Sequence, residues 1–192
     1  MTKPPTEPLS WLRAPDASEL PPEVLELWRL PLEKLGFVPN VLRLYALRPA
    51  RLLAWNAHYE EAMKGESTLT KAEREMIGVV VSATNRCPYC ISAHSAALRK
   101  LTKDPELADQ IAADHARARI PERMKLALDH AVKLTRSPAS MTEADVQALR
   151  DAGWTDEDVM DITEVTALFN FSNRMASGLG WAPNPEYQSL GR

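Results

Sequence analysis

The sequence has few cysteines, no basic cluster and no long apolar run, and each shortage excludes a class of protein. Of its 192 residues only two are cysteines, too few for a scaffold stapled by several disulfides. The formal net charge is −3, and no basic cluster exceeds two residues, so the sequence lacks the electrostatic footprint of a nucleic-acid-binding protein. The apolar run Met76–Val81 is interrupted by Gly78 and is far too short to span a bilayer. We therefore expect neither nucleic acid nor membrane among its partners.

The first residues also lack a targeting signal. Met1–Pro8 is polar and rich in proline, without the apolar segment of a secretory signal, so we expect a cytoplasmic protein. Apolar residues make up 45% and charged residues 26% of the chain, which is typical of a folded protein, and the length suits one domain. In a reducing compartment, a cysteine pair separated by two residues is more often redox-active or metal-binding than structural. Cys87 and Cys90 are therefore the first candidates for function.

Strand-like alternation of apolar and polar residues does not persist beyond a few positions, so we predict an all-α fold. Prolines cluster between residues 4 and 49 and return at 183 and 185. We divide the chain into an N-terminal arm (1–22), an all-helical domain (23–182) and a C-terminal tail (183–192). Periodicity, caps and stops predict helices over Pro22–Leu30, Pro49–Lys64, 70–83, 85–100, Pro105–Asp114, Pro121–Thr135, Thr142–Ala152 and Thr155–Leu179.

Two of these helices would carry the cysteines and an acidic residue. Thr70 and Glu73 form a capping box, in which the threonine hydroxyl takes an amide of the first turn and the glutamate reaches back to the cap. Asn85 is a plausible N-cap for the following helix, with Pro88 in its first turn, where a missing N–H costs nothing. Cys87 and Cys90 are therefore predicted to lie at a helix start.

The residues predicted to lie near the cysteine pair suit thiol chemistry. On a helix, Cys87 and Cys90 share one face and can interconvert between dithiol and disulfide with little backbone movement. The first turn supplies unpaired amides and the positive end of the macrodipole, which favour a thiolate. His94 follows Cys90 by one turn and could carry protons to or from the sulfurs. If the two helices pack as an antiparallel hairpin, Glu75 can approach His94 and orient it or accept its proton.

Two other interpretations of this pattern remain open. The cysteines and His94 could simply pack in the core, because free cysteine behaves as a small buried hydrophobe. They could also be three of the four ligands of a structural zinc, but no second CxxC or HxxxH occurs. His58, His115 or His130 would then have to supply the fourth ligand. We predict neither a metal nor a cofactor, because the added His94 and Glu75 favour redox chemistry.

The spacing of Glu75, Cys87, Cys90 and His94 resembles the signature of the alkyl hydroperoxidase D (AhpD) group, within the carboxymuconolactone decarboxylase superfamily. Several flanking segments resemble a subgroup called peroxidase-related enzymes. These segments are Gly36–Asn40, Leu69–Thr70, Glu73–Glu75, Asn85–Cys87, Ala152–Trp154 and Phe169–Arg174. The resemblance covers roughly residues 20 to 182, and its motifs are specific in combination.

This resemblance implies an AhpD-like helical domain, a homo-oligomer (dimer, trimer or hexamer), and reduction of a small-molecule peroxide by a cysteine pair that an external dithiol resets. By position in the motif, it makes Cys90 the peroxide-attacking cysteine, Cys87 the resolving cysteine, and Glu75 with His94 the proton relay. Tyr89 stands where the best-studied hydroperoxidases of the family have a histidine. A phenol, with a pKa of about 10, donates a hydrogen bond but is a poor base at neutral pH. The decarboxylase branch lacks the cysteine pair, which argues against lactone decarboxylation.

The predicted function is therefore that of an antioxidant enzyme, a thiol-dependent peroxidase with peroxiredoxin-like activity. Two alternatives remain. One is a redox-sensing or metal-binding oligomer without peroxide turnover, and the other is a superfamily enzyme that acts on another small molecule.

Polar residues outside the motif receive structural interpretations. Asn170, Asn173 and Arg174 form a polar patch on a late helix, which we interpret as an inter-helix hydrogen-bond network rather than an anion contact at a subunit interface. His58 could line the pocket, but a lone histidine is more often a surface or satisfied core residue.

Overall fold

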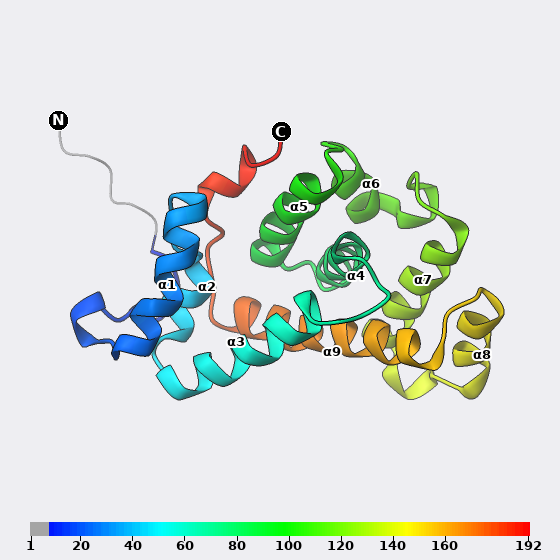
Figure 1. Ribbon diagram of the computed structural model, residues 1–192, viewed down its shortest axis with the longest axis horizontal. Coiled ribbons are helices and arrows are strands. Elements are labelled where there is room, and N and C mark those ends of the chain that lie inside the picture. Colours follow the sequence, from blue (N-terminus) through cyan, green and yellow to red (C-terminus); the bar gives the residue numbers. More distant parts are fainter. Residues whose placement is uncertain (1–7) are drawn as a thin grey trace.

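Helix α4 (Lys71–Thr84) is the centre of the molecule, and its sequence suits that position. Every residue from Arg74 to Ser82 is buried, so this helix is covered on all sides rather than along one stripe. Figure 1 views α4 nearly end-on, with α5 (Pro88–Thr102), α6 (Leu107–Asp114) and α7 (Glu122–Arg136) around it. The long α9 (Asp156–Gly178) packs along the same core. The largest apolar cluster is built around α4.

The computed structural model describes residues 8–192, and these contain helices and no strand, which confirms the all-α prediction. Four further α-helices complete this part of the chain: α1 (Pro22–Leu35), α2 (Asn40–Tyr45), α3 (Pro49–Lys64) and α8 (Glu143–Asp151). Short 3₁₀ turns lie at Ala17–Glu19, His115–Arg117, Pro138–Ser140 and Pro185–Gln188. Among residues 8–192, no helix combines the length and apolar character needed to cross a membrane.

Several helix boundaries follow the sequence signals. Helix α3 has the predicted bounds, and the capping box of α4 is present, with the Thr70 hydroxyl accepting from the Glu73 amide at 3.2 Å. Helix α1 extends past the predicted end at Leu30 to Leu35. Pro31 lies inside it and removes one hydrogen bond without ending the helix, and Gly36, with φ of 81°, terminates it.

The prediction that Asn85 caps the cysteine-bearing helix is wrong. Asn85 closes α4, and Cys87 is the N-cap of α5, with Pro88 as its first residue. The side-chain amide of Asn85 donates instead to the side chains of Asn170 and Asn173 on α9. The local sequence predicts a cap, but contacts with a helix that is distant in sequence determine the position of this side chain.

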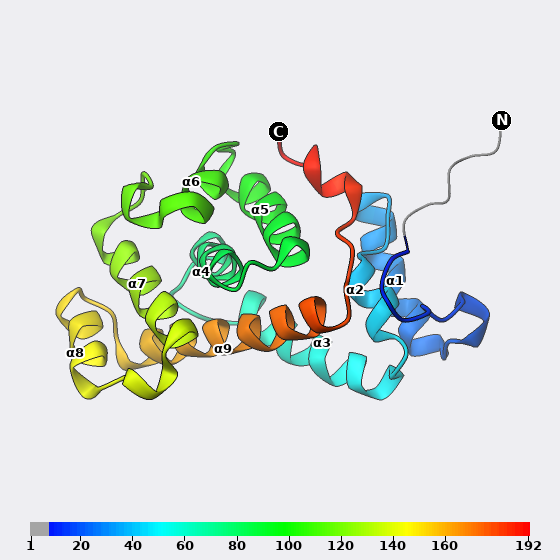
Figure 2. The ribbon, with the colours of Figure 1, turned by 180° about the vertical axis from the view of Figure 1, so that it is seen from behind.

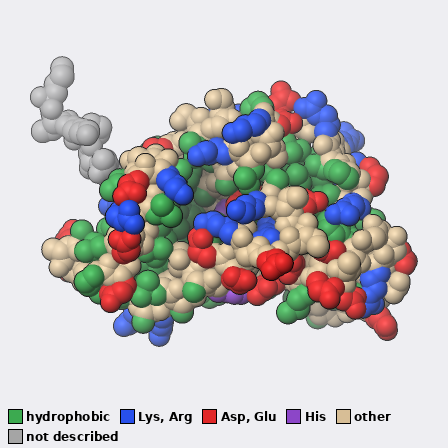
Figure 3. Space-filling view, in the orientation of Figure 1, with side chains coloured by type: hydrophobic (Ala, Val, Ile, Leu, Met, Phe, Trp, Pro, Cys, Tyr) green, Lys and Arg blue, Asp and Glu red, His purple; other side chains and the backbone are tan. Residues whose placement is uncertain are grey.

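Residues 9–11 pair with residues 179–182, which follow α9, and both segments pack against the start of α5. The Trp11 amide donates to the Leu179 carbonyl at 3.1 Å, and the Ala182 amide donates to the Leu9 carbonyl at 2.9 Å. Both views place these segments beside α1 and α2 (Figures 1 and 2). Residues 1–7 of the predicted arm lie outside the described residues, and the division into arm, domain and tail remains a prediction. On the face in Figure 3, acidic and basic side chains are interspersed, and neither sign forms a continuous field.

Candidate functional site

The turn between α4 and α5 fixes the position of Cys87. Arg86 adopts a left-handed conformation, with φ of 53°, which reverses the chain in the space of one residue. The Cys87 amide then donates to the Ser82 carbonyl at 3.0 Å. As N-cap, Cys87 lies beside the unpaired amides of the first turn of α5, while Cys90 lies one turn into the helix.

Both cysteines are free and almost completely buried, with 0% of Cys87 and 3% of Cys90 exposed. The pKa of the Cys87 thiol is lowered to about 6, mainly by a hydrogen bond from the Cys90 side chain. Hydrogen bonds from the backbone amides of Cys90 and Tyr89 and from the Ser177 hydroxyl lower this pKa further. Cys87 in turn is the first cause that raises the pKa of Cys90, followed by burial. The two shifts have opposite directions, so loss of a proton is favoured at Cys87 over Cys90.

Glu75 and His94 meet as expected from a helical hairpin. The Glu75 carboxylate is 2.7 Å from His94 Nδ1, and both side chains are largely buried, with 10% and 14% exposed. Because α4 and α5 pack along their lengths, a residue early in α4 reaches the second turn of α5. The contact orients the His94 ring on the face of α5 that Cys90 shares.

Tyr59 of α3 and Phe169 of α9 form an aromatic wall beside the His94 ring. Phe169 contacts it edge-on, with ring centroids 4.4 Å apart, and the Tyr59 ring lies 6.4 Å away. Phe169 can approach because α4 has Gly78 at this point, where a Cβ atom would lie only 2.5 Å from the Phe169 ring. Gly78, which interrupts the apolar run in the sequence, is thus a packing requirement of the site.

The polar patch of α9 forms the inter-helix network that the sequence predicts. Asn173 donates to the Ser82 hydroxyl at 3.0 Å and Asn170 donates to the Thr135 hydroxyl at 2.9 Å, while both accept from Asn85. Asn173 also lowers the pKa of Cys90, although less than Cys87 and burial raise it. Arg174 donates to the Asn170 carbonyl and side chain. The network therefore ties the thiol turn to α7 and α9.

Tyr89 faces the covering segments. Its hydroxyl accepts a hydrogen bond from the Val41 amide at 2.9 Å, and its ring contacts Trp181 edge-on. Burial raises the pKa of Tyr89, so the phenol stays protonated. The described contacts therefore give Tyr89 an anchoring role between α5 and the start of α2.

Tyr187 is not among the site residues predicted from the sequence, because it lies in the predicted tail. It is buried against Phe37, with ring centroids 5.3 Å apart, and its carbonyl accepts from the buried Arg99 at 2.8 Å. Burial raises the pKa of Tyr187 to about 12, and the charges of Cys90 and Glu75 contribute to that shift. A lone aromatic residue in an otherwise polar terminal segment was the only available signal.

The other histidines lie elsewhere. His58 is half-exposed on α3 and 3.6 Å from Glu164, His115 pairs with Asp129, and His130 is buried in α7. Within residues 8–192, no three residues of the types His, Cys, Asp and Glu gather closely enough to hold a metal ion. None of the three candidates for a fourth zinc ligand is brought to the cysteines.

Comparisons with known proteins identify relatives of the chain in sequence and in fold. A model of the carboxymuconolactone decarboxylase family matches residues 49–128. The structure described as an alkylhydroperoxidase AhpD core, an uncharacterized peroxidase-related protein from Ralstonia eutropha, is 42% identical with a TM-score of 0.94, covering 97% of this chain and 98% of that one. An uncharacterized peroxidase-related protein from Silicibacter sp. is 43% identical with a TM-score of 0.92, covering 100% of both chains. The debrominase Bmp8 shares the fold at 17% identity, with a TM-score of 0.79 and 97% of each chain covered. No curated protein sequence matches the chain.

Proposed function

The chain belongs to the carboxymuconolactone decarboxylase superfamily, in its AhpD-like group, and from this premise we propose that it is a thiol-dependent peroxidase. The observation that carries the proposal is the short Glu75–His94 contact on the helix face that also holds Cys90, next to a second free thiol. A buried carboxylate–imidazole pair beside a dithiol can move the protons that peroxide reduction requires.

The proposed cycle uses both sulfurs. As Cys90 attacks the peroxide, its proton passes to the Cys87 thiolate or to the Glu75–His94 pair, and the O–O bond breaks. The leaving alkoxide takes a proton from the relay and departs as an alcohol, and Cys90 becomes a sulfenic acid. Cys87 then attacks Cys90, which releases water and forms the disulfide. An external dithiol reduces that disulfide and becomes a disulfide itself.

The charge distribution makes the order of attack testable. The resemblance assigns the attack to Cys90, which shares a face with His94, whereas the lowered pKa of Cys87 favours a thiolate at that sulfur. We retain Cys90 as the attacking sulfur, because it is the sulfur one helical turn from the relay.

Single substitutions separate the two orders. In Cys87→Ser, brief treatment with hydrogen peroxide or cumene hydroperoxide should leave a sulfenic acid on Cys90 that dimedone traps, as measured by mass spectrometry. In Cys90→Ser, peroxide-dependent oxidation of dithiothreitol should vanish while the circular dichroism spectrum persists. Trapping on Cys87 in the Cys90→Ser variant would reverse the order of attack. Retained turnover in that variant would contradict a cycle that needs both sulfurs, and absence of peroxide-dependent turnover in the native protein would contradict the peroxidase proposal.

The pH dependence of alkylation gives an independent readout. Because the pKa of Cys87 is lowered to about 6, the rate of iodoacetamide labelling in the reduced protein should rise through pH 6 and level off by neutral pH. Cys90→Ala removes the main cause of the shift, so its midpoint should move towards the ordinary thiol value of about 8.5.

A redox sensor without turnover would behave differently in the same assays. Peroxide would oxidise the pair once, but dithiothreitol would not be consumed catalytically. The described residues offer no metal cluster that would support the metal-binding form of this alternative.

A further inference from the structure

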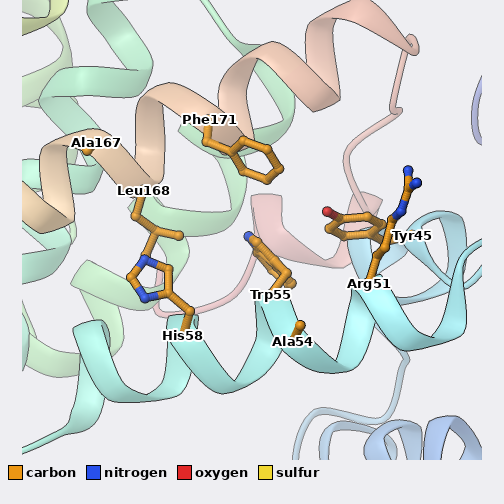
Figure 4. Close-up of a pocket in the computed structure, with 8 residues that line it drawn as sticks. All are labelled: Tyr45, Arg51, Ala54, Trp55, His58, Ala167, Leu168 and Phe171. Carbon is orange, nitrogen blue, oxygen red and sulfur yellow. The ribbon is translucent and has the colours of Figure 1, made fainter.

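A surface groove lies between α3 and α9, on the other side of the aromatic wall from His94. Its volume is about 480 Å³, and its lining includes Tyr45, Trp55, His58, Leu168 and Phe171, with Arg51 at one end. Figure 4 shows α3 side chains facing α9 across it. Figures 1 and 2 show α3 and α9 running in opposite directions, and His58 of α3 lies 3.6 Å from Glu164 of α9. The volume is in the range of pockets that hold small organic molecules.

The floor of the groove has an unsatisfied hydrogen-bond donor. Trp55 Nε1 is buried, and no acceptor lies within hydrogen-bonding distance among residues 8–192. Figure 4 shows this nitrogen on the side of the indole that faces α9, and the Tyr45 hydroxyl pointing into the same space. Buried donors are nearly always paired, so an orphaned indole N–H beside an open groove indicates a missing acceptor.

The two ends of the groove differ in charge. At one end stand the exposed Arg51 and the start of α3, whose first-turn amides carry partial positive charge. At the other end, Glu164 accompanies His58. An anionic group is therefore favoured at the Arg51 end, and an apolar ring fits between Trp55 and Phe171, of which 46% is exposed.

We propose that this groove binds a planar organic anion, with its ring between Trp55 and Phe171, an oxygen at the Trp55 indole and its negative charge at Arg51. The inference goes beyond the peroxidase proposal and does not depend on it. The two sites share a wall, because Trp55 stacks on Tyr59 at 5.4 Å between ring centroids, and Tyr59 in turn lies beside His94.

Calorimetry with 2-naphthoate tests the proposal on the full chain. The native protein should bind it at one site, while 2-naphthamide, which keeps the ring but lacks the charge, should bind about tenfold more weakly. Arg51→Gln should weaken 2-naphthoate binding by about tenfold and leave 2-naphthamide unchanged. Trp55→Phe keeps the ring and removes the donor, so it should weaken both ligands by about threefold to tenfold.

Matched controls lie away from the groove. Arg150→Gln on α8 and Trp11→Phe, at a residue that is 76% exposed, should leave binding unchanged. Absence of 2-naphthoate binding, or equal loss in the control and groove variants, would overturn the proposal. A second copy of the chain is the competing occupant of the groove, and analytical sedimentation tests for it. The proposal would also be overturned if the chain self-associates, if Phe171→Ser abolishes that association, and if 2-naphthoate does not compete with it.

Discussion

The α4–α5 hairpin and the two terminal segments that cover it are held by different kinds of contact. In the hairpin, the Cys87 amide donates to the Ser82 carbonyl, and the Thr70 hydroxyl accepts from the Glu73 amide in the same turn. In the covering segments, Ser10 donates to the carbonyl of Leu179 and Asn40 to that of Ala182, across 169 and 142 positions of sequence. The proposed catalytic groups are therefore placed by local structure, whereas the segments that cover them are held by contacts between distant parts of the chain.

The largest effect should come from the hairpin. Glu75→Gln keeps the size of the side chain but removes the charge that contacts His94 and that, in the proposed relay, accepts its proton. We expect the rate of peroxide-dependent dithiothreitol oxidation to fall by about 100-fold, the lower range for loss of general acid–base catalysis. Stopped-flow tryptophan fluorescence of the reduced protein measures the oxidation step directly.

A second acidic residue beside a histidine provides the control. Glu164→Gln alters the half-exposed contact with His58, which lies in the groove rather than beside the thiols. It should change the rate by less than about twofold, because an exposed pair contributes little. Equal loss in the two variants would remove Glu75 from the relay.

The same contrast explains what could be predicted from the sequence. The helical hairpin, the capping box of α4 and the meeting of Glu75 with His94 all follow from periods and caps within short stretches. The role of Asn85 could not be predicted, because Asn170 and Asn173 compete for its side chain from a helix that is distant in sequence. The sequence places Tyr187 in a predicted tail, because no local signal indicates that Arg99 donates to its carbonyl.

The next largest effect should come from the C-terminal segment around Tyr187, which Arg99 binds. Arg99 is 3% exposed and donates to the carbonyls of Tyr187 and Leu190 at 2.8 and 3.1 Å. Arg99→Leu removes two charge-assisted hydrogen bonds, so the free energy of unfolding in urea should fall by about 3 kcal/mol. Chymotrypsin should cleave at Tyr187 faster, and labelling of the cysteines should accelerate.

Arg119→Leu is the matched change at an exposed arginine, whose side chain pairs with Glu106 and Asp104. It should alter stability by less than about 0.5 kcal/mol. If Arg99→Leu left the labelling rate of the cysteines unchanged, the segment around Tyr187 would not control access to them.

Tyr89→Phe tests the link between the two regions. The phenol accepts from the Val41 amide at 2.9 Å, and removing it leaves that amide without its partner. We expect a loss of about 1 kcal/mol in the free energy of unfolding, with the peroxide rate within about threefold of the native value. A much larger loss of rate at unchanged stability would instead give Tyr89 a part in the proton relay.

The smallest effect should come from the turn itself. Arg86 has φ of 53°, and a left-handed conformation costs a residue with a side chain about 1–2 kcal/mol. Glycine removes that cost but loses more entropy on folding, so Arg86→Gly should raise the free energy of unfolding by no more than about 1 kcal/mol. Lys103→Gly, at the left-handed end of α5, should give a similar gain away from the thiols. The Arg86 side chain is not among the causes that lower the pKa of Cys87, so the midpoint of alkylation should stay near 6 in both variants. A shift confined to Arg86→Gly would mean that the strained turn, and not only the Ser82 and Asn85 contacts, sets the position of the thiolate.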